Sequence, residues 1–226
     1  MKNIIITGCS RGIGFELVKY FSNPQYQIIA IARNVETITQ LNMTNVLAFK
    51  ADITNEKDLK ALKSYINKTW THVDIVIHSA GKLLNKPFFK TSTADFLEVY
   101  KVNIFAVAEL TRVLIPFLQK GSHVVTISSM GAIQGSLKFA GLAAYTSSKG
   151  ALITLTELLA EEYKNARISF NVLALGAVQT EMLTEAFPKY KAPVNAEEMA
   201  NYIGEFALKG NKHFNGKIIQ VASTTP

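Results

Sequence analysis

The sequence contains a single cysteine, Cys9, in 226 residues. One cysteine cannot form a disulfide within the chain, so a reducing compartment is expected, which points to the cytoplasm. Acidic residues are also in the minority, since 17 Asp and Glu face 24 Lys and Arg, for a formal charge of +7. The basic residues are scattered without a run of five, which favours a solvated surface over a nucleic-acid site. A phosphate-rich cofactor or an acidic carrier would also suit this charge.

Long apolar runs are missing as well. No stretch reaches the length of a membrane-spanning helix, so no membrane partner is expected. The short apolar run at residues 4–6 has no small-residue cleavage site and passes directly into a glycine turn, which indicates a first β-strand and not a signal segment. Linkers and repeats are absent too, and 48% of the residues are hydrophobic. Residues 1–226 are therefore predicted to form one globular domain.

Apolar strands alternate with helical segments along the chain. Strands are predicted at 3–7, 27–32, 46–51, 73–78, 123–128, 167–174 and 217–221, and helices at 13–22, 56–68, 93–118, 143–165 and 196–208. Asn55 is the expected N-cap of the second helix, a capping box at Ser92–Asp95 opens the third, and Pro116 is expected to bend that helix near its end. The alternation predicts an α/β fold with a doubly wound, seven-stranded parallel sheet and helices on both faces.

A glycine-rich turn follows the first predicted strand. Gly8, Gly12 and Gly14 stand in the pattern Gly-x-x-x-Gly-x-Gly, which differs from both G-x-G-x-x-G and the Walker P-loop. Glycine at a strand end permits a tight turn, and glycines farther on let the backbone approach a pyrophosphate at the N-terminus of the next helix. In a doubly wound pattern, this turn indicates nucleotide binding.

Tyr145 and Lys149 stand four residues apart in a predicted helix, one turn apart on one face. An ammonium near a phenol favours the phenolate and lowers the tyrosine pKa from its ordinary ~10. Such a tyrosine can exchange a proton with a substrate oxygen. Taken alone, this spacing more often belongs to a surface lysine beside a half-buried tyrosine, so the pair gains meaning only from the motifs around it.

Together these motifs resemble the classical short-chain dehydrogenases/reductases. The resemblance covers nearly the whole chain and rests on motifs that occur in the family's order: Thr7–Gly14, Asp52, His78-Ser79-Ala80-Gly81, Asn103, Ser128-Ser129, and Tyr145 with Lys149. It implies a single Rossmann-fold domain, with a cofactor half at about residues 1–90 and a catalytic and substrate half at about 91–226. The implied activity is hydride transfer between a nicotinamide cofactor and a carbonyl or secondary alcohol.

The resemblance implies a role for each residue of the reaction centre. Tyr145 would be the general acid or base, Lys149 would lower its pKa and bind the nicotinamide ribose, and Ser129 would hydrogen-bond the substrate oxygen. Asn103 would hold a water that links the lysine to solvent, although it could instead be a polar residue that bends its helix. Ser128 is the alternative to Ser129, but the family usually employs the second serine of such a pair. No metal ion is expected.

The cofactor is expected to be NADP(H), with NAD(H) possible. The second predicted strand ends without a carboxylate, and Arg33 stands just past the usual acidic position, where it and Arg11 would suit a 2′-phosphate. Arg33 could also be an ordinary surface residue. By the resemblance, Asp52 and the backbone of Ile53 would contact the adenine. The expected cofactor contacts are Gly8, Ser10, Arg11, Gly12, Ile13, Gly14, Arg33, Asp52, Ile53, Ser79, Ala80, Gly81, Tyr145, Lys149, Val178 and Thr180.

The chain departs from the family pattern at several points. His78 and Ser79 stand where two asparagines are usual, and Leu175 replaces the usual proline before Gly176. The interval from Ser129 to Tyr145 is longer than is common, which enlarges a loop within residues 134–141. The segment 181–188 could form only a small lid. With apolar residues nearby, these features predict a partly open, apolar-walled pocket; the residues are Met130, Ile133, Leu137 and Phe139.

The substrate is expected to be a small carbonyl or alcohol compound, and a 3-oxoacyl thioester on an acidic carrier is one such substrate. The four-residue Tyr145–Lys149 spacing argues against the enoyl-reductase branch of the family, which spaces this pair more widely. The alternative function is a non-catalytic nicotinamide sensor or signalling protein, against which the intact Ser129, Tyr145 and Lys149 count. Both long helices are apolar over much of their circumference, which predicts a homodimer or homotetramer.

Overall fold

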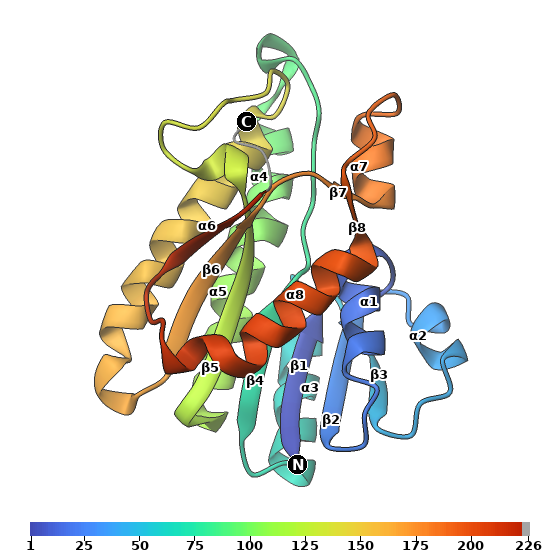
Figure 1. The fold of residues 1–226 in the computed structure, drawn as a ribbon, viewed down its shortest axis with the longest axis vertical. Helices are drawn as coiled ribbons and strands as arrows, with labels where there is room; N and C mark the ends of the chain where they lie inside the picture. The colour runs from blue at the N-terminus through green and yellow to red at the C-terminus, as the bar shows by residue number, and fades with distance from the viewer. Residues whose placement is uncertain (223–226) are drawn as a thin grey trace.

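The computed structural model describes residues 1–222. Seven parallel strands form one sheet in the order β3-β2-β1-β4-β5-β6-β9 (Figure 1). The strands are β1 (Lys2–Thr7), β2 (Tyr26–Ala32), β3 (Val46–Lys50), β4 (Val73–His78), β5 (Leu118–Ser129), β6 (Ser169–Leu175) and β9 (Ile218–Val221). The chain runs outward from β1 to β3 and then returns to place β4 beside β1, which creates a switch point between these two strands. The predicted doubly wound, seven-stranded parallel sheet is confirmed.

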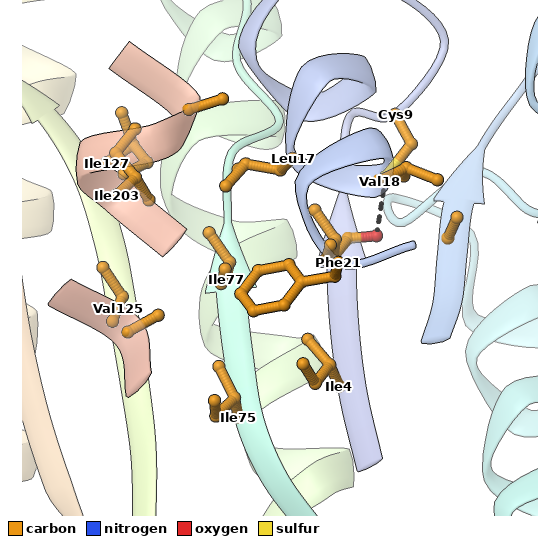
Figure 2. Packing of buried hydrophobic residues seen from close by; sticks show 14 of the residues in the cluster. Ile4, Cys9, Leu17, Val18, Phe21, Ile75, Ile77, Val125, Ile127 and Ile203 are labelled. Carbon is orange, nitrogen blue, oxygen red and sulfur yellow. Dashed lines mark hydrogen bonds between the residues drawn. The ribbon is translucent and has the colours of Figure 1, made fainter. Parts of the chain in front are cut away.

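Helices cover both faces of the sheet (Figure 1). One face carries α1 (Gly12–Tyr20), α2 (Glu36–Gln40) and α8 (Ala196–Lys209), and the other carries α3 (Glu56–Thr69), α5 (Ala106–Leu114) and α6 (Ala143–Glu162). A hydrophobic core lies on each face of the sheet, and successive residues of a strand point into opposite cores. Ile4 packs against the first set of helices and Ile5 against the second. Figure 2 shows the first core, where Leu17 of α1 and Phe21, which directly follows α1, lie beside Ile77 of β4. This double coverage explains why the strands are apolar throughout.

Side-chain caps decide where several helices begin. Asn55 caps α3 through its side-chain oxygen, and the capping box of Ser92 and Asp95 opens α4 (Thr93–Tyr100), so both sequence predictions are confirmed. Asn195 does the same for α8. By contrast, α1 starts after Arg11 with no side-chain cap and no acidic residue in its first turn. Its first N–H groups are therefore left for another acceptor.

The helix predicted at 93–118 is interrupted and ends early. After α4 the backbone forms a π-helical turn at Lys101–Phe105, and α5 ends at Leu114. Pro116 lies in the following 3-10 turn, so the helix stops before the proline and does not bend at it, because proline has no N–H to continue the ladder. As a result β5 begins at Leu118, and not at His123 as predicted. The π-helical turn is the segment that carries Asn103.

Short elements around the carboxyl ends of the strands were not predicted. They are α2, the six-residue α7 (Glu181–Ala186), and the pair β7 (Val178–Gln179) and β8 (Val194–Asn195). The parallel pairing of β7 with β8 brings both ends of the segment 180–193 together, so this segment projects as a strap that carries α7. Within residues 1–222, no helix is both long and apolar enough to cross a bilayer.

Two histidines are buried within the sheet. His123 donates from Nδ1 to the Ala207 carbonyl at 2.9 Å, and burial lowers its pKa to about 4. His78 lies 3.0 Å from the Thr111 hydroxyl through Nε2, and burial together with the charge of Lys149 lowers its pKa to about 4 as well. In the described part of the chain, Nδ1 of His78 has no hydrogen-bond partner. Both imidazoles are therefore neutral in the folded protein at neutral pH.

Acid is expected to destabilise the protein through these histidines. In the unfolded chain both histidines have a pKa of about 6.5, so below that pH they bind protons that the folded chain does not bind. The stability that the neutral histidines contribute is therefore complete above about pH 6.5 and is lost as the pH falls toward 4. We expect each histidine to cost about 2 kcal/mol of unfolding free energy between pH 7.5 and pH 5. Urea titrations at both pH values should show that His78→Asn removes about half of this acid sensitivity. The exposed His213, changed to Asn, is the control, and an equal effect there would contradict the assignment.

Candidate active site

A cleft of about 1190 Å³ opens at the carboxyl ends of the strands, beside the switch point between β1 and β4. Its walls come from the loops after β1, β2, β3, β4, β5 and β6 together with the strap. Every residue predicted to contact the cofactor lines this cleft, and so do Ser129, Tyr145 and Lys149. Asn103 is the exception, because it is fully buried behind the wall.

The glycine turn brings two loops into direct backbone contact. Gly8 has φ +75°, and a Cβ there would lie 2.7 Å from the Cα of Ala80. Thr7, which begins the predicted motif but was given no role of its own, accepts a hydrogen bond from the Ala80 N–H at 3.1 Å. A Cβ at Gly14 would lie 2.2 Å from the Gly8 carbonyl oxygen, so α1 begins directly against the turn. The uncapped N–H groups of α1 thus border the cleft, an arrangement that fits a diphosphate.

The far end of the cleft carries charges of both signs. Arg33 is exposed at the end of β2 and lines the cleft with Asp52, which follows β3. One carboxylate oxygen of Asp52 accepts hydrogen bonds from the N–H and hydroxyl of Thr54, each at 2.8 Å. Burial opposes ionisation of Asp52, but these hydrogen bonds and the charges of Arg33 and Lys101 outweigh it and lower the pKa. Asp52 is thus held as an anion whose second oxygen is available to a ligand.

Arg11 is engaged by a residue far away in the sequence. Its guanidinium forms a two-point ion pair with Glu185 of α7, with Nη2 and Oε2 3.1 Å apart. Hydrogen bonding within the pair raises the pKa of Arg11 and lowers that of Glu185. Both side chains line the cleft and are about half exposed. Any anion that binds Arg11 in this cleft must therefore compete with Glu185, which the sequence gave no means to detect.

Tyr145 and Lys149 lie one turn apart in α6 as predicted, yet the pKa of the tyrosine is not lowered. The Lys149 ammonium donates to the Ile127 carbonyl at 2.8 Å and stands 5.8 Å from the centre of the tyrosine ring. Burial lowers the pKa of Lys149 to about 8. Burial also raises the pKa of Tyr145 to about 12, and the neighbouring Ser129 side chain offsets only part of this rise. The prediction that the pKa of Tyr145 is lowered was wrong, because desolvation of the phenol is the largest influence on that pKa.

The two serines at the end of β5 have different neighbours. The Ser128 hydroxyl is buried and donates to the Lys149 carbonyl at 3.0 Å, so it holds α6 against β5. Ser129 accepts from the Gly131 N–H at 3.3 Å and lies close enough to Tyr145 to influence the pKa of its phenol. Successive residues of a strand point to opposite faces of the sheet, which explains why the two serine side chains have different neighbours. Both serines line the cleft, but it is the Ser129 hydroxyl that lies beside the Tyr145 phenol.

Asn103 joins three elements behind the cleft wall. Its side-chain oxygen accepts from the Lys82 N–H at 2.8 Å, and its amide donates to the Lys82 carbonyl at 3.0 Å. The same amide donates to the Ser148 hydroxyl at 2.8 Å, which in turn donates to the Tyr145 carbonyl at 2.7 Å. The π-helical turn, the loop after β4 and α6 are thereby connected. Neither Lys82 nor Ser148 was identified from the sequence, although Ser148 lies inside the Tyr145–Lys149 motif.

The substrate side of the cleft is largely apolar, though not with all the residues predicted. Met130 and Phe139 line the cleft, whereas Ile133 does not and Leu137 points to solvent with 55% of its surface exposed. The strap supplies further apolar walls: Met182, Leu183 and Phe187 lie in the small lid predicted at 181–188, whereas Tyr190 lies beyond it and was not predicted. Across residues 1–222, no three His, Cys, Asp or Glu side chains are grouped so that they could hold a metal ion.

Comparison with known proteins assigns the family. The profile of the short chain dehydrogenase family matches residues 2–191, and the chain belongs to this family. A 7alpha-hydroxysteroid dehydrogenase of Escherichia coli (strain K12) is 32% identical, over 80% of this chain and 73% of that protein. A fatty acyl-CoA reductase of Acinetobacter baylyi is 26% identical, over 99% of this chain and 79% of that protein. The protein is thus an oxidoreductase of a family that binds nicotinamide cofactors.

A solved structure shares the fold over almost the whole chain. The structure of 4-hydroxyisoleucine dehydrogenase complexed with NADH superimposes with a TM-score of 0.85 at 23% identity. The match covers 98% of this chain and 97% of that one. The Rossmann-type arrangement predicted from the sequence is therefore confirmed.

Proposed function

We propose that this protein is an NADP(H)-dependent enzyme that interconverts a carbonyl compound and a secondary alcohol, with Tyr145 as the general acid or base. The observation that carries the proposal is the meeting of Ser129, Tyr145 and Lys149 in the same cleft as the uncapped start of α1. These groups come from the ends of different elements, as expected for a site assembled at a switch point. Membership of an oxidoreductase family supports the same chemistry.

Each residue has a defined part in this reaction. The glycine turn would hold the diphosphate of a nicotinamide cofactor, which would supply hydride transfer to or from the substrate carbon. Tyr145 gives a proton to the substrate oxygen in reduction, and a phenol pKa of about 12 keeps it in the protonated form that this direction needs. Ser129 donates a hydrogen bond to the same oxygen, and Lys149 stabilises the phenolate once it forms. Asn103 holds the loop and helix around them, and the family resemblance implies that it would also hold a water connecting Lys149 with solvent.

The preference for NADP(H) is proposed from Arg33 and Arg11. Arg33 is exposed in the cleft with no carboxylate within salt-bridge distance among the described residues, so its guanidinium is available to a 2′-phosphate. Arg11 could join it only by leaving Glu185. The remaining expected contacts, from Gly8 to Thr180, border the same cleft. An apolar substrate is proposed because Met182, Phe187 and their neighbours form the opposite wall.

Changing Arg33 to serine is expected to lower kcat/KM for NADPH about 10- to 100-fold while changing that for NADH less than about twofold. The reason is the loss of charge-assisted hydrogen bonds that only the phosphate can accept. Steady-state kinetics with both cofactors on one carbonyl substrate measure the effect. Arg112→Ser, on α5 outside the cleft, is the matched control. A wild-type enzyme that prefers NADH, or equal losses with both cofactors, would refute the assignment to Arg33.

A homodimer or homotetramer remains our proposal for the assembly. Leu97 of α4, Phe105 of the π-helical turn and Leu158 of α6 are between 52% and 60% exposed. These helices cover one face of the sheet and turn the three side chains outward. Large apolar side chains on neighbouring helices support a surface that a second copy would cover.

A further inference from the structure

Three loops border the mouth of the cleft, and we call them the rim loops: residues 82–92, 133–141 and 187–193. They follow β4, β5 and α7, so they gather at the carboxyl end of the sheet, at the top of Figure 1. The Lys86 N–H donates to the Gly141 carbonyl at 2.9 Å and thereby joins the first two loops. The Asn85 side chain donates to the Ala186 carbonyl at 2.9 Å and ties the first loop to the start of the third.

The rim loops are basic throughout. They contain six lysines and no aspartate or glutamate, namely Lys82, Lys86, Lys90, Lys138, Lys189 and Lys191. Lys82 and Lys86 are neutralised by Glu98 and Asp95 of α4. The other four are exposed, and none has a carboxylate within 4.0 Å in the described structure. The rim loops therefore carry four exposed lysines that no carboxylate of the described residues neutralises by an ion pair.

The same loops expose large apolar side chains. Of eleven large hydrophobic residues exposed in the described structure, five lie in the rim loops: Phe88 at 71%, Phe89 at 83%, Leu137 at 55%, Phe139 at 50% and Tyr190 at 49%. Lys90 extends to within 5.5 Å of the centre of the Phe89 ring. Two of the five, Phe139 and Tyr190, also line the cleft. Large apolar side chains are thus present both on the outer rim and in the wall of the cleft.

We propose that the rim loops dock this protein on an anionic membrane surface, with the mouth of the cleft facing the lipid. Lysines attract anionic headgroups, while phenylalanine and leucine insert at the boundary of headgroups and acyl chains. Docking of this kind needs no spanning helix. An acidic protein partner would match the lysines, but the neighbouring Phe88 and Phe89, both more than two thirds exposed, favour lipid. The proposal departs from the sequence-based expectation of no membrane partner, and the vesicle experiment below decides between the two.

The docked orientation has a consequence for the site. The apolar walls of the cleft would open toward the bilayer, so an apolar carbonyl compound could pass from the lipid to Tyr145 without crossing bulk water. This part rests on the proposed function, whereas the docking itself depends only on the rim loops.

Vesicle flotation with the full chain tests the docking without substrate or cofactor. We expect binding to vesicles of about one-third phosphatidylglycerol in phosphatidylcholine, little binding to phosphatidylcholine alone, and release as salt rises above about 0.1 M. Lys90→Gln with Lys191→Gln should weaken binding about 25-fold, since each lysine near an anionic surface contributes about fivefold. Phe88→Ser with Phe89→Ser should weaken binding at constant charge. Lys68→Gln with Lys212→Gln, at the opposite end of the sheet, is the charge-matched control and should bind as the wild type.

The proposal is overturned if the wild type ignores anionic vesicles, or if the control weakens binding as much as the rim variant. It is also overturned if Phe88→Ser with Phe89→Ser dissociates an oligomer in sedimentation runs and leaves vesicle binding unchanged, because the rim would then be an interface between copies. Tight, rim-dependent binding of an acidic carrier protein without vesicle binding would assign the surface to that partner instead. Failure of flotation would leave the proposed reaction standing, whereas turnover assays test that reaction independently.

Discussion

Replacing Tyr145 by phenylalanine is expected to lower kcat/KM for carbonyl reduction about a thousandfold while changing the Kd for NADPH less than about threefold. The substitution removes the hydroxyl that we propose as the proton donor to the substrate oxygen, and it leaves the half-buried ring in place. Lys149 remains bonded to the Ile127 carbonyl, so the wall of the cleft should keep its shape. Consumption of NADPH across a panel of carbonyl compounds measures the rate, and fluorescence titration measures cofactor binding.

Tyr163→Phe is the matched control for this experiment. Tyr163 directly follows the same helix, α6, packs near Phe170 and does not line the cleft. Its loss of a hydroxyl should leave kcat/KM within about twofold. Retention of activity in Tyr145→Phe would remove the tyrosine from the reaction. Tight NADPH binding by the wild type with no turnover on any carbonyl would favour the sensor alternative.

Replacing Gly14 by alanine is expected to destabilise the protein by about 3 kcal/mol and to weaken cofactor binding more than about tenfold. The new Cβ would lie 2.2 Å from the Gly8 carbonyl oxygen and 2.8 Å from its carbon, and backbone atoms cannot rotate away as a side chain does. The start of α1 must therefore shift from the turn and carry its free N–H groups with it. Urea unfolding and cofactor titration report the two effects.

Gly150→Ala in α6 is the control, because it changes helix propensity in the same way as Gly14→Ala but does not create a steric clash. A Cβ at Gly150 would meet only the Ala132 carbonyl oxygen, at 3.9 Å, so this variant should be as stable as the wild type or more stable by about 0.5–1 kcal/mol. Both glycines are helical, which makes the comparison direct. Equal behaviour of the two variants would show that the close approach at Gly14 does not govern stability.

The order of the seven strands of the main sheet along the chain, and the end of the sheet at which the cleft lies, follow from the sequence alone. Strands such as β2 are apolar on both faces because helices cover both faces of the sheet. Each such strand is a short, continuous apolar run, so it can be recognised in the sequence without a structure. Caps at Asn55 and Ser92 are equally local, since the side chain bonds to its own helix. A doubly wound order then places the strand ends, and hence Gly8 and Ser129, along one edge.

Tertiary structure decided the features that depend on distant partners or on burial. Arg11 meets Glu185 across 174 positions, and Asn103 reaches Ser148 across 45, separations at which no local pattern operates. The three rim loops form one basic and apolar surface only because parallel strands deliver them to the same end of the sheet. The pKa of Tyr145 rises instead of falling because desolvation of the phenol, which depends on everything packed around it, exceeds the influence of a lysine one turn away.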